Sequence, residues 1–321
     1  MSVSLAYHAS HEQFPPSELL QYAIDAEAAG FDAVHSSDHF HPWSVNQGHS
    51  GFAFSWIAAA MQATTIPFSM VCAPGQRYHV AIAAQAIATL SEMFPGRYNV
   101  ELASGEALNE SITGEPWPSK DDRNKRLLEC VSVIRRLLNG EEVSFDGTIH
   151  VREAKIYSLP TQQPKLFCAA ISEQTSGWAG QWADGLLTTA GDTDEVLKKK
   201  NAFESNGGAG KPVALQYSFS YGQTEQEALD GAYHQWRSNV LPPDQLADLY
   251  KPEHFDNAAK NMTRKDMADK MPLITNMEQL FAEIRRLADA GADLISLHNV
   301  NRNHTDFINA FAQYKRDWNR N

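Results

Sequence analysis

Short segments with the character of strands alternate with longer segments of helical periodicity along most of the chain. Residues 3–7 and 213–221 are rich in β-branched and aromatic side chains, which favour strands. Residues 17–29 place apolar side chains near helical spacing, with Ser17 as a candidate N-cap and Gly30 where a C-terminal glycine belongs. This alternation predicts repeated βα units around a parallel sheet.

The predicted units number about eight, which is the number of a (β/α)8 TIM barrel. Strands are predicted at residues 3–7, 33–37, 68–73, 98–103, 166–170, 186–190, 213–221 and 294–300. Helices are predicted at residues 17–29, 54–64, 80–93, 123–138, 175–182, 195–204 and 277–290, and from residue 305 onward. A doubly wound open sheet is the structural alternative, because the same alternation would produce it.

Two segments interrupt the regular pattern. Around residues 143–157, Asp146-Gly147 is a turn signal and predicts a small hairpin insertion. Residues 222–276 are polar and helix-prone, show no obvious strand, and predict a helical insertion. No linker rich in Pro, Ser or Gly divides the chain, so we expect residues 1–321 to form one barrel domain with two insertions.

Composition excludes several classes of protein. The net charge is -12, and no basic run is present, so the chain lacks the positive charge that binding of nucleic acid or of an anionic membrane surface would require. The three cysteines are too widely spaced to predict a disulfide framework or a CxxC metal site. Because no signal peptide or membrane span is evident, we expect a cytoplasmic protein.

The segment HSSDHFHPW concentrates candidate chemistry at the end of the second predicted strand. It contains Asp38, Trp43 and three histidines, His35, His39 and His41. In an extended conformation the three imidazoles would share one face, which raises the alternative of a metal site. No further His or carboxylate cluster at ligand spacing supports that alternative, so a polar loop at the barrel mouth is preferred and no metal is predicted.

A second candidate segment, SGEALNE, follows the fourth predicted strand. Gly105 would let a ligand approach the backbone, and Glu106 places a carboxylate at the strand end. The structural alternative is that Glu106 only complements a helix dipole. A functional role for Glu106 is favoured, because Glu12 after the first strand and His39 after the second would face the same rim of a barrel as Glu106.

In chain order, the motifs YHASHEQF, SDHFHPW, QGH with FSW, SGEALNE and GEPWP resemble those of the luciferase-like flavin and deazaflavin oxidoreductases. The resemblance is greatest to the F420-dependent sugar-phosphate dehydrogenases and a sister subgroup that uses FMN. It extends from about residue 3 to residue 190, including RLLECVSVIRRLLNGEEVSFDG and AGQWADG, and fades in the later insertion. It implies a bacterial-luciferase-like TIM barrel, usually homodimeric, with a flavin-type ring at the mouth.

The resemblance also implies roles for individual residues. His39 is expected to be the general base on a substrate hydroxyl, and Glu106 the acid that delivers a proton to the reduced cofactor. Trp43 is expected to shape the substrate side, and Glu12 is a further carboxylate of the pocket. The implied cofactor contacts are Asp38, Met70, Val71, Gly105, Asn109, Ala170, Ile171, Ser172 and Thr175, with a bulge that often carries a cis peptide at Met70-Val71.

Two departures from the family pattern bear on substrate and cofactor. Asp192 stands where the sugar-phosphate enzymes have a Lys, and their later basic phosphate ligands have no convincing counterpart here. A negative charge at a phosphate subsite opposes anion binding by ~1 kcal/mol or more, so a non-phosphorylated substrate is predicted. After Ala170, residues 171–175 (ISEQT) replace the Gly-Gly-Pro or Ser-Gly-Pro turn of many relatives. Ser172 and Thr175 could still bind a phosphate at a helix N-terminus, but Glu173 would oppose the anionic tail of F420. The altered turn would suit FMN, and both F420 and FMN stay open as cofactors.

The leading hypothesis is therefore an oxidoreductase that transfers hydride between F420 or FMN and a small neutral alcohol or carbonyl compound. The first alternative is an FMNH2-dependent monooxygenase of the same barrel, which would use O2 and a partner flavin reductase. The second is a non-catalytic flavin-binding protein, which the retained Asp38, His39, Trp43 and Glu106 argue against.

Overall fold

Eight parallel strands form a closed barrel in the computed structural model, which describes residues 3–318. In barrel order they are β1 (Ser4–Ala9), β2 (Ala33–Ser36), β3 (Phe68–Cys72), β4 (Tyr98–Leu102), β7 (Leu166–Ala169), β8 (Leu186–Thr189), β9 (Val213–Tyr221) and β11 (Leu294–Asn299). β8 pairs with β9, and β11 pairs with β1, which closes the sheet. The predicted TIM barrel is confirmed, and the open sheet is excluded.

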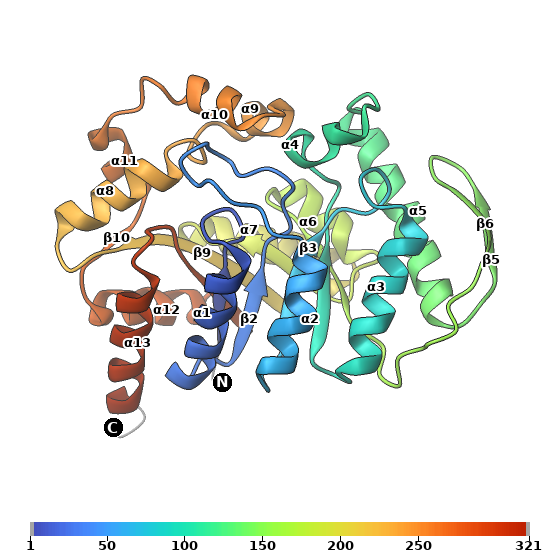
Figure 1. Ribbon diagram of the computed structural model, residues 1–321, viewed down its shortest axis with the longest axis horizontal. Helices are drawn as coiled ribbons and strands as arrows, with labels where there is room; N and C mark the ends of the chain where they lie inside the picture. Colours follow the sequence, from blue (N-terminus) through green and yellow to red (C-terminus); the bar gives the residue numbers. More distant parts are fainter. Residues whose placement is uncertain (1–2, 319–321) are drawn as a thin grey trace.

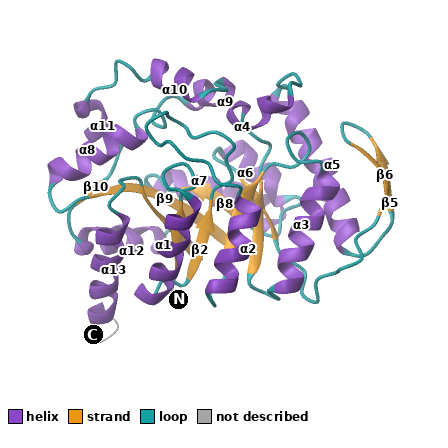
Figure 2. Ribbon diagram, in the orientation of Figure 1, coloured by secondary structure: helices purple, strands orange, loops and turns teal. Residues whose placement is uncertain are grey.

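Helices surround the barrel and cover its outer face (Figures 1 and 2). They are α1 (Pro16–Ala29), α2 (Ala53–Ala63), α3 (Val80–Met93), α5 (Lys120–Leu138), α6 (Glu173–Gly180), α7 (Thr193–Phe203), α12 (Met277–Asp289) and α13 (His304–Trp318), with a π turn at Glu204–Gly208. In α12, Leu280, Ile284 and Leu287 recur on one face and are buried against the rest of the core. Such a stripe binds a helix to the barrel through the hydrophobic effect.

The ends of α1 show one correct and one wrong prediction. Gly30 has a φ of 91° and ends the helix, as predicted, because a left-handed residue accommodates the C-terminal turn. Ser17 is not the N-cap, since the helix begins at Pro16 and Pro15 occupies the cap position without a side-chain hydrogen bond. Proline at the first helical position has the right φ and lacks an N–H that would otherwise need a partner.

The two segments that interrupt the predicted βα pattern form a hairpin and a group of helices. β5 (Val143–Asp146) and β6 (His150–Ala154) pair antiparallel as a hairpin. Residues 222–276 contain α8 (Glu225–Trp236), α9 (Pro243–Asp248), α10 (Pro252–Ala258) and α11 (Arg264–Lys270). They also contain β10 (Leu273–Ile274), which pairs with the end of β9 and contradicts the expectation of no strand, because two residues leave no sequence pattern.

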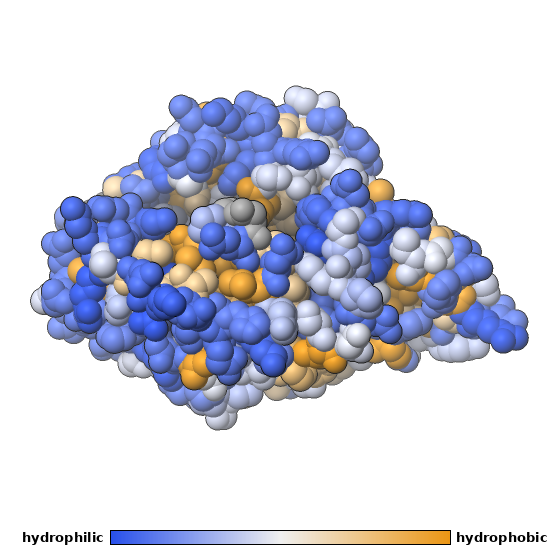
Figure 3. Space-filling model, turned by 90° about the horizontal axis from the view of Figure 1, so that it is seen from above, coloured by the Kyte–Doolittle hydropathy of each residue, from blue (hydrophilic) through white to orange (hydrophobic). Residues whose placement is uncertain are grey.

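The helical insertion forms a roof above the carboxyl ends of the strands (Figure 1). There α9 packs against the short helix α4 (Ala107–Glu110), which a 3-10 turn (Ser111–Thr113) follows. Viewed from above, apolar side chains gather in a central hollow that polar side chains frame (Figure 3). Exposed apolar residues from the loops on this side include Phe40, Val45 and Ile171.

The inside of the barrel is polar. His8 Nδ1 lies 2.9 Å from His35 Nδ1, and the ring centroids of His8 and His298 are 4.0 Å apart. His35 Nε2 lies 3.9 Å from Oε2 of Glu101, and both residues are buried. No helix within residues 3–318 is long and apolar enough to cross a bilayer.

Candidate active site

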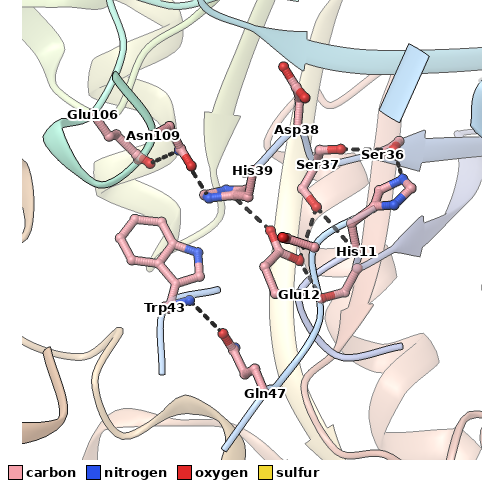
Figure 4. A network of polar contacts seen from close by, with 12 residues as sticks. His11, Glu12, Ser36, Ser37, Asp38, His39, Trp43, Gln47, Glu106 and Asn109 are labelled. Carbon is pink, nitrogen blue, oxygen red and sulfur yellow. Dashed lines mark hydrogen bonds and ion pairs between the residues drawn. The ribbon is translucent and has the colours of Figure 1, made fainter. Parts of the chain in front are cut away.

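His39 lies at the centre of a chain of polar contacts at the barrel mouth (Figure 4). It belongs to the loop between β2 and α2. Its Nε2 lies 3.2 Å from Oε1 of Glu12, and its Nδ1 lies 3.1 Å from Nδ2 of Asn109. The Trp43 ring stands beside it, with ring centroids 5.1 Å apart. The structure thus brings together four residues that the sequence predicted for the site.

Glu12 is a buried carboxylate with hydroxyl donors on one oxygen. It follows β1, and its Oε2 accepts hydrogen bonds from Ser10 Oγ at 2.7 Å and Ser37 Oγ at 3.0 Å. Burial by itself would raise the pKa of Glu12, but nearby His39 and the two hydroxyls lower it below its ordinary value. Glu12 is therefore an ionised acceptor for the imidazole.

The pKa of Glu106 is shifted in the opposite direction from that of Glu12. It follows β4, and its Oε2 accepts a hydrogen bond from Asn109 Nδ2 at 3.3 Å. Burial raises the pKa of Glu106, Glu12 adds to this effect, and His39 opposes it. The two carboxyl groups lie on either side of an imidazole, and Glu12 favours its charged form whereas Glu106 favours its protonated form. Such a pair is typical of a base and an acid.

Gly105 shapes the turn that carries Glu106. Its φ of 86° lies in the left-handed region, and a Cβ there would come within 3.1 Å of Glu110 Cγ. A side chain at this position would therefore strain the turn and displace its neighbour.

Asp38 belongs to a separate cluster. Its carboxylate pairs with Arg77 Nη2 at 2.8 Å and accepts a hydrogen bond from the Tyr78 hydroxyl at 3.0 Å. Arg77 also faces Glu110, with Nε 3.5 Å from Oε1. Burial raises the pKa of Asp38, and Arg77 opposes the shift. In Figure 4 its carboxylate points away from His39, so the carboxylate that contacts the imidazole is Glu12.

Sequence reasoning missed Arg77, Tyr78 and Glu110. Arg77 and Tyr78 come soon after β3, and side chains after barrel strands reach the mouth, so the same rule that found Glu12 would have found them. The buried ion cluster anchors the loop after β2 to the loop after β3.

The roof holds the Trp43 loop. Phe255 of α10 is fully buried and packs edge-on against Trp43, with ring centroids 5.3 Å apart. The neighbouring Asp256 accepts hydrogen bonds from Ser44 Oγ at 2.9 Å and from Val45 N–H at 3.0 Å. Sequence reasoning missed these two residues because nothing in the insertion indicates which of its residues face the mouth.

The expected bulge and cis peptide at Met70-Val71 are wrong. Both residues lie in β3, which pairs with β4 from Phe68 to Cys72 without a register break, and residues 3–318 contain no cis peptide bond. The continuous ladder satisfies the backbone hydrogen bonds that a bulge would interrupt.

Four further predicted residues lie at the carboxyl end of β7. Ala170 is buried, Ile171 is exposed, and Ser172 caps α6 by accepting a hydrogen bond from Thr175 N–H at 3.2 Å. A groove of about 650 Å³ begins at Ser172 and follows α6 away from the His39 network.

A cation stands between the ends of β4 and β7. Lys120, the first residue of α5, donates a hydrogen bond to Ser104 Oγ at 2.8 Å and interacts electrostatically with Cys168 of β7. Burial and nearby Arg123 lower the pKa of Lys120. In the described part of the chain its ammonium forms no ion pair with a carboxylate, so it is available to an anionic group.

The three histidines near β2 have separate partners, contrary to the shared face that an extended segment would give. His35 points into the barrel, and His41 Nδ1 lies 2.9 Å from the carbonyl oxygen of Leu108. Among residues 3–318, no group of three or more His, Cys, Asp or Glu residues has the arrangement of a metal site.

Comparisons with known proteins place the chain in a family. Residues 2–294 match the model of the luciferase-like monooxygenases. The F420-dependent glucose-6-phosphate dehydrogenase of Kribbella flavida is 32% identical over 98% of this chain and 97% of its own length. A protein of the same name from Microbacterium testaceum is 30% identical over 96% of this chain and 94% of its own length.

Solved structures agree. An F420-dependent secondary alcohol dehydrogenase, in complex with an F420-acetone adduct, is 29% identical with a TM-score of 0.89 over 98% of both chains. A long-chain alkane monooxygenase, 14% identical with a TM-score of 0.71 over 99% of this chain and 92% of its own, shares the fold. From the family match and the identity with its members, the chain belongs to the luciferase-like monooxygenase family of enzymes.

Proposed function

We propose that this protein is an F420-dependent oxidoreductase that transfers hydride between the cofactor and a small, non-phosphorylated secondary alcohol or its ketone. The observation that carries the proposal is the arrangement of Glu12, His39, Asn109 and Glu106, with the two carboxyl pKa values shifted in opposite directions. Oxidation of an alcohol needs a base for the hydroxyl proton, and reduction of a deazaflavin needs a proton as well as a hydride. The site offers one group for each task.

In this proposal the chain's own residues handle the protons. His39 accepts the hydroxyl proton, and the Glu12 carboxylate, 3.2 Å from the ring, stabilises the imidazolium. Glu106 holds a proton that it can donate. Trp43 closes one side of the substrate space under Phe255. F420, when bound, would supply the hydride acceptor.

The residues at the rim fit an anionic cofactor. Lys120 offers an ammonium between β4 and β7, and the N–H groups at the start of α6 lie at the end of β7. Lys120 favours F420, whose tail carries more negative charge than the phosphate of FMN. Glu173, in the first turn of α6, is itself negatively charged and therefore disfavours the more anionic tail of F420.

The turn after β8 bears on the substrate. Lys199 Nζ donates to the carbonyl oxygen of Thr189 at 3.2 Å, and Arg286 Nη2 donates to that of Gly191 at 3.0 Å. Two basic groups therefore do reach this turn, which the sequence did not predict. Carboxylates already interact with both groups. Arg286 forms an ion pair with Glu283 at 2.8 Å, and Lys199 interacts electrostatically with Glu195 and Asp192.

A phosphate at this turn would have to compete with those carboxylates, which supports a neutral substrate. All eight curated relatives compared carry glucose-6-phosphate in their names, whereas the structural neighbour is a secondary alcohol dehydrogenase. The neighbour's chemistry agrees better with the charge balance at the turn.

The test is anaerobic reduction of F420 by the purified protein with 2-propanol or glucose-6-phosphate as the hydride donor. The proposal predicts loss of the oxidised F420 absorbance with 2-propanol and at least ~10-fold lower kcat/KM with glucose-6-phosphate, equivalent to ~1.4 kcal/mol. A preference for glucose-6-phosphate would overturn the substrate assignment. Substrate-dependent O2 consumption with FMNH2 and a flavin reductase, and no F420 reduction, would favour the monooxygenase.

A further inference from the structure

We propose that Asn109 is a positioning residue that fixes which nitrogen of His39 carries the proton. The resemblance casts Asn109 as a cofactor contact, but its contacts assign it a role within the protein. The catalytic consequence rests on the proposed function, whereas the assignment of the proton does not.

A backbone group fixes the orientation of the Asn109 amide. Oδ1 accepts a hydrogen bond from Phe40 N–H at 2.9 Å, so Oδ1 faces the backbone and the NH2 group must face the other way. That NH2 group lies 3.1 Å from His39 Nδ1 and 3.3 Å from Glu106 Oε2. Asn109 is buried, so water does not compete for the hydrogen bonds of its side-chain amide.

The amide orientation determines the tautomer of His39. An NH2 group only donates, so Nδ1 must accept and carry the lone pair, and the proton of the neutral ring is on Nε2. The other side of the ring gives the same answer, because Glu12 is an ionised acceptor 3.2 Å from Nε2. Asn109 and Glu12 thus act on the two nitrogens in the same direction.

This tautomer makes Nδ1 the nitrogen of His39 that can accept a proton from the substrate. Nδ1 holds the lone pair, and the Asn109 NH2 group occupies the position of a hydrogen-bond donor to it. A substrate hydroxyl that displaces this NH2 group would donate to the same lone pair, while Asn109 keeps its bond to Glu106. On oxidation the O–H proton would move to Nδ1 as the carbonyl forms, and F420, when bound, would accept the C–H electron pair as hydride.

The experiment uses 15N-histidine NMR of the cofactor-free protein with the N109D variant. N109D keeps the oxygen that accepts from Phe40 N–H but replaces the NH2 donor with an acceptor. The His39 signals, identified by their loss in H39Q, should show one pyridine-type and one pyrrole-type nitrogen in the wild type at a pH at which the ring is neutral. In N109D both nitrogens should become pyrrole-type, because a carboxylate on each side holds a proton on each nitrogen. N206D, at an Asn on the outer helix layer, is the matched control and should leave the spectrum unchanged.

Two results would overturn the proposal. One is a wild-type His39 with its proton on Nδ1, and the other is a folded N109D with unchanged His39 signals, as a purely structural Asn109 would give. In the F420 assay, N109D should lower kcat by ~10²-fold or more and change the Kd for F420 less than ~3-fold. If the NMR result holds and no variant reduces F420, the tautomer assignment stands and the proposed function fails.

Discussion

At the residue scale, the two carboxyl groups on either side of the His39 imidazole have pKa values shifted in opposite directions. Burial raises the pKa of Glu106, which accepts a hydrogen bond only from an amide. Burial acts in the same direction on Glu12, but His39 and two hydroxyl hydrogen bonds outweigh it and lower the pKa. The difference between these two glutamates arises from how far the neighbouring imidazole and hydroxyl groups offset burial. It supports the proposed division of labour between base and acid.

Removing the imidazole should separate catalysis from binding. His39→Ala should lower kcat for F420 reduction by ~10²- to 10⁴-fold, the range expected for loss of a general base. The Kd for F420, measured by quenching of its fluorescence, should stay within ~3-fold of the wild type. His150→Ala, on the exposed hairpin, serves as the control. Wild-type turnover by His39→Ala would remove His39 from the reaction.

The raised pKa of Glu106 predicts a pH dependence. An acid with a raised pKa keeps its proton as the pH rises past its ordinary value, and its function is lost only when the pH passes the raised value. The rate should therefore fall on the alkaline side, and Glu106→Gln should lower kcat by ~10²-fold or more and flatten that limb. The measurement is kcat against pH for both proteins. An unchanged alkaline limb in Glu106→Gln would assign it to another group.

At the scale of elements, the roof links the insertion to the site. α10 contributes Phe255 against Trp43 and Asp256 to the backbone and side chain of the same loop. The Trp43 loop is therefore held from above by a segment about 200 residues away in the chain. Loops at a barrel mouth depend on such tertiary contacts for their geometry.

Phe255→Ala should loosen this roof without disturbing the barrel. Loss of the aromatic contact should raise KM for the alcohol by ~10-fold, equivalent to ~1.4 kcal/mol, with the Kd for F420 unchanged. Hydrogen exchange should accelerate in residues 37–52 and in α10, and not in the strands. Phe145→Ala, on the hairpin, is the matched aromatic control. Unchanged KM and exchange in Phe255→Ala would show that α10 does not hold the loop.

The elements were largely predictable from the sequence, and the contacts between them were not. Periodicity placed α3 and β9 at their observed bounds, because buried strands and amphipathic helices carry their burial in their residue order. It also placed Glu12, His39 and Glu106 on one rim, because βα topology puts all strand ends at one face. It could not show that Asp38 pairs with Arg77, or that β10 exists, because these depend on neighbours distant in sequence.

At the scale of the whole molecule, the polar interior of the barrel makes stability depend on pH. Burial lowers the pKa of His35 to about 4 and of His298 to about 3, and lowers that of His8 as well. Below their ordinary 6.5, the unfolded chain binds protons that the folded barrel excludes, so stability falls as the pH falls. Burial raises the pKa of Glu101 to about 8, so from its ordinary 4.5 up to about 8 the folded state holds a proton that the unfolded chain has lost.

These opposing effects predict maximum stability near pH ~6.5. Above it, the free energy of unfolding should fall by up to a few kcal/mol as the pH approaches 8, because of Glu101. Glu101→Gln removes the titrating group, and its urea midpoint should change less between pH 6.5 and 8 than that of the wild type. Glu92→Gln, on the exposed face of α3, is the control. Parallel pH profiles for the wild type and Glu101→Gln would refute this explanation.

The proposed function requires that the mouth of this barrel bind a deazaflavin beside His39. The most direct measurement is a titration of the purified protein with F420 and, separately, with FMN, followed by fluorescence at low salt. We predict saturable binding with a lower Kd for F420, and a ~10-fold or greater loss of F420 affinity in Lys120→Ala with a smaller loss for FMN. Saturable binding of neither cofactor, or tighter binding of FMN, would contradict the account.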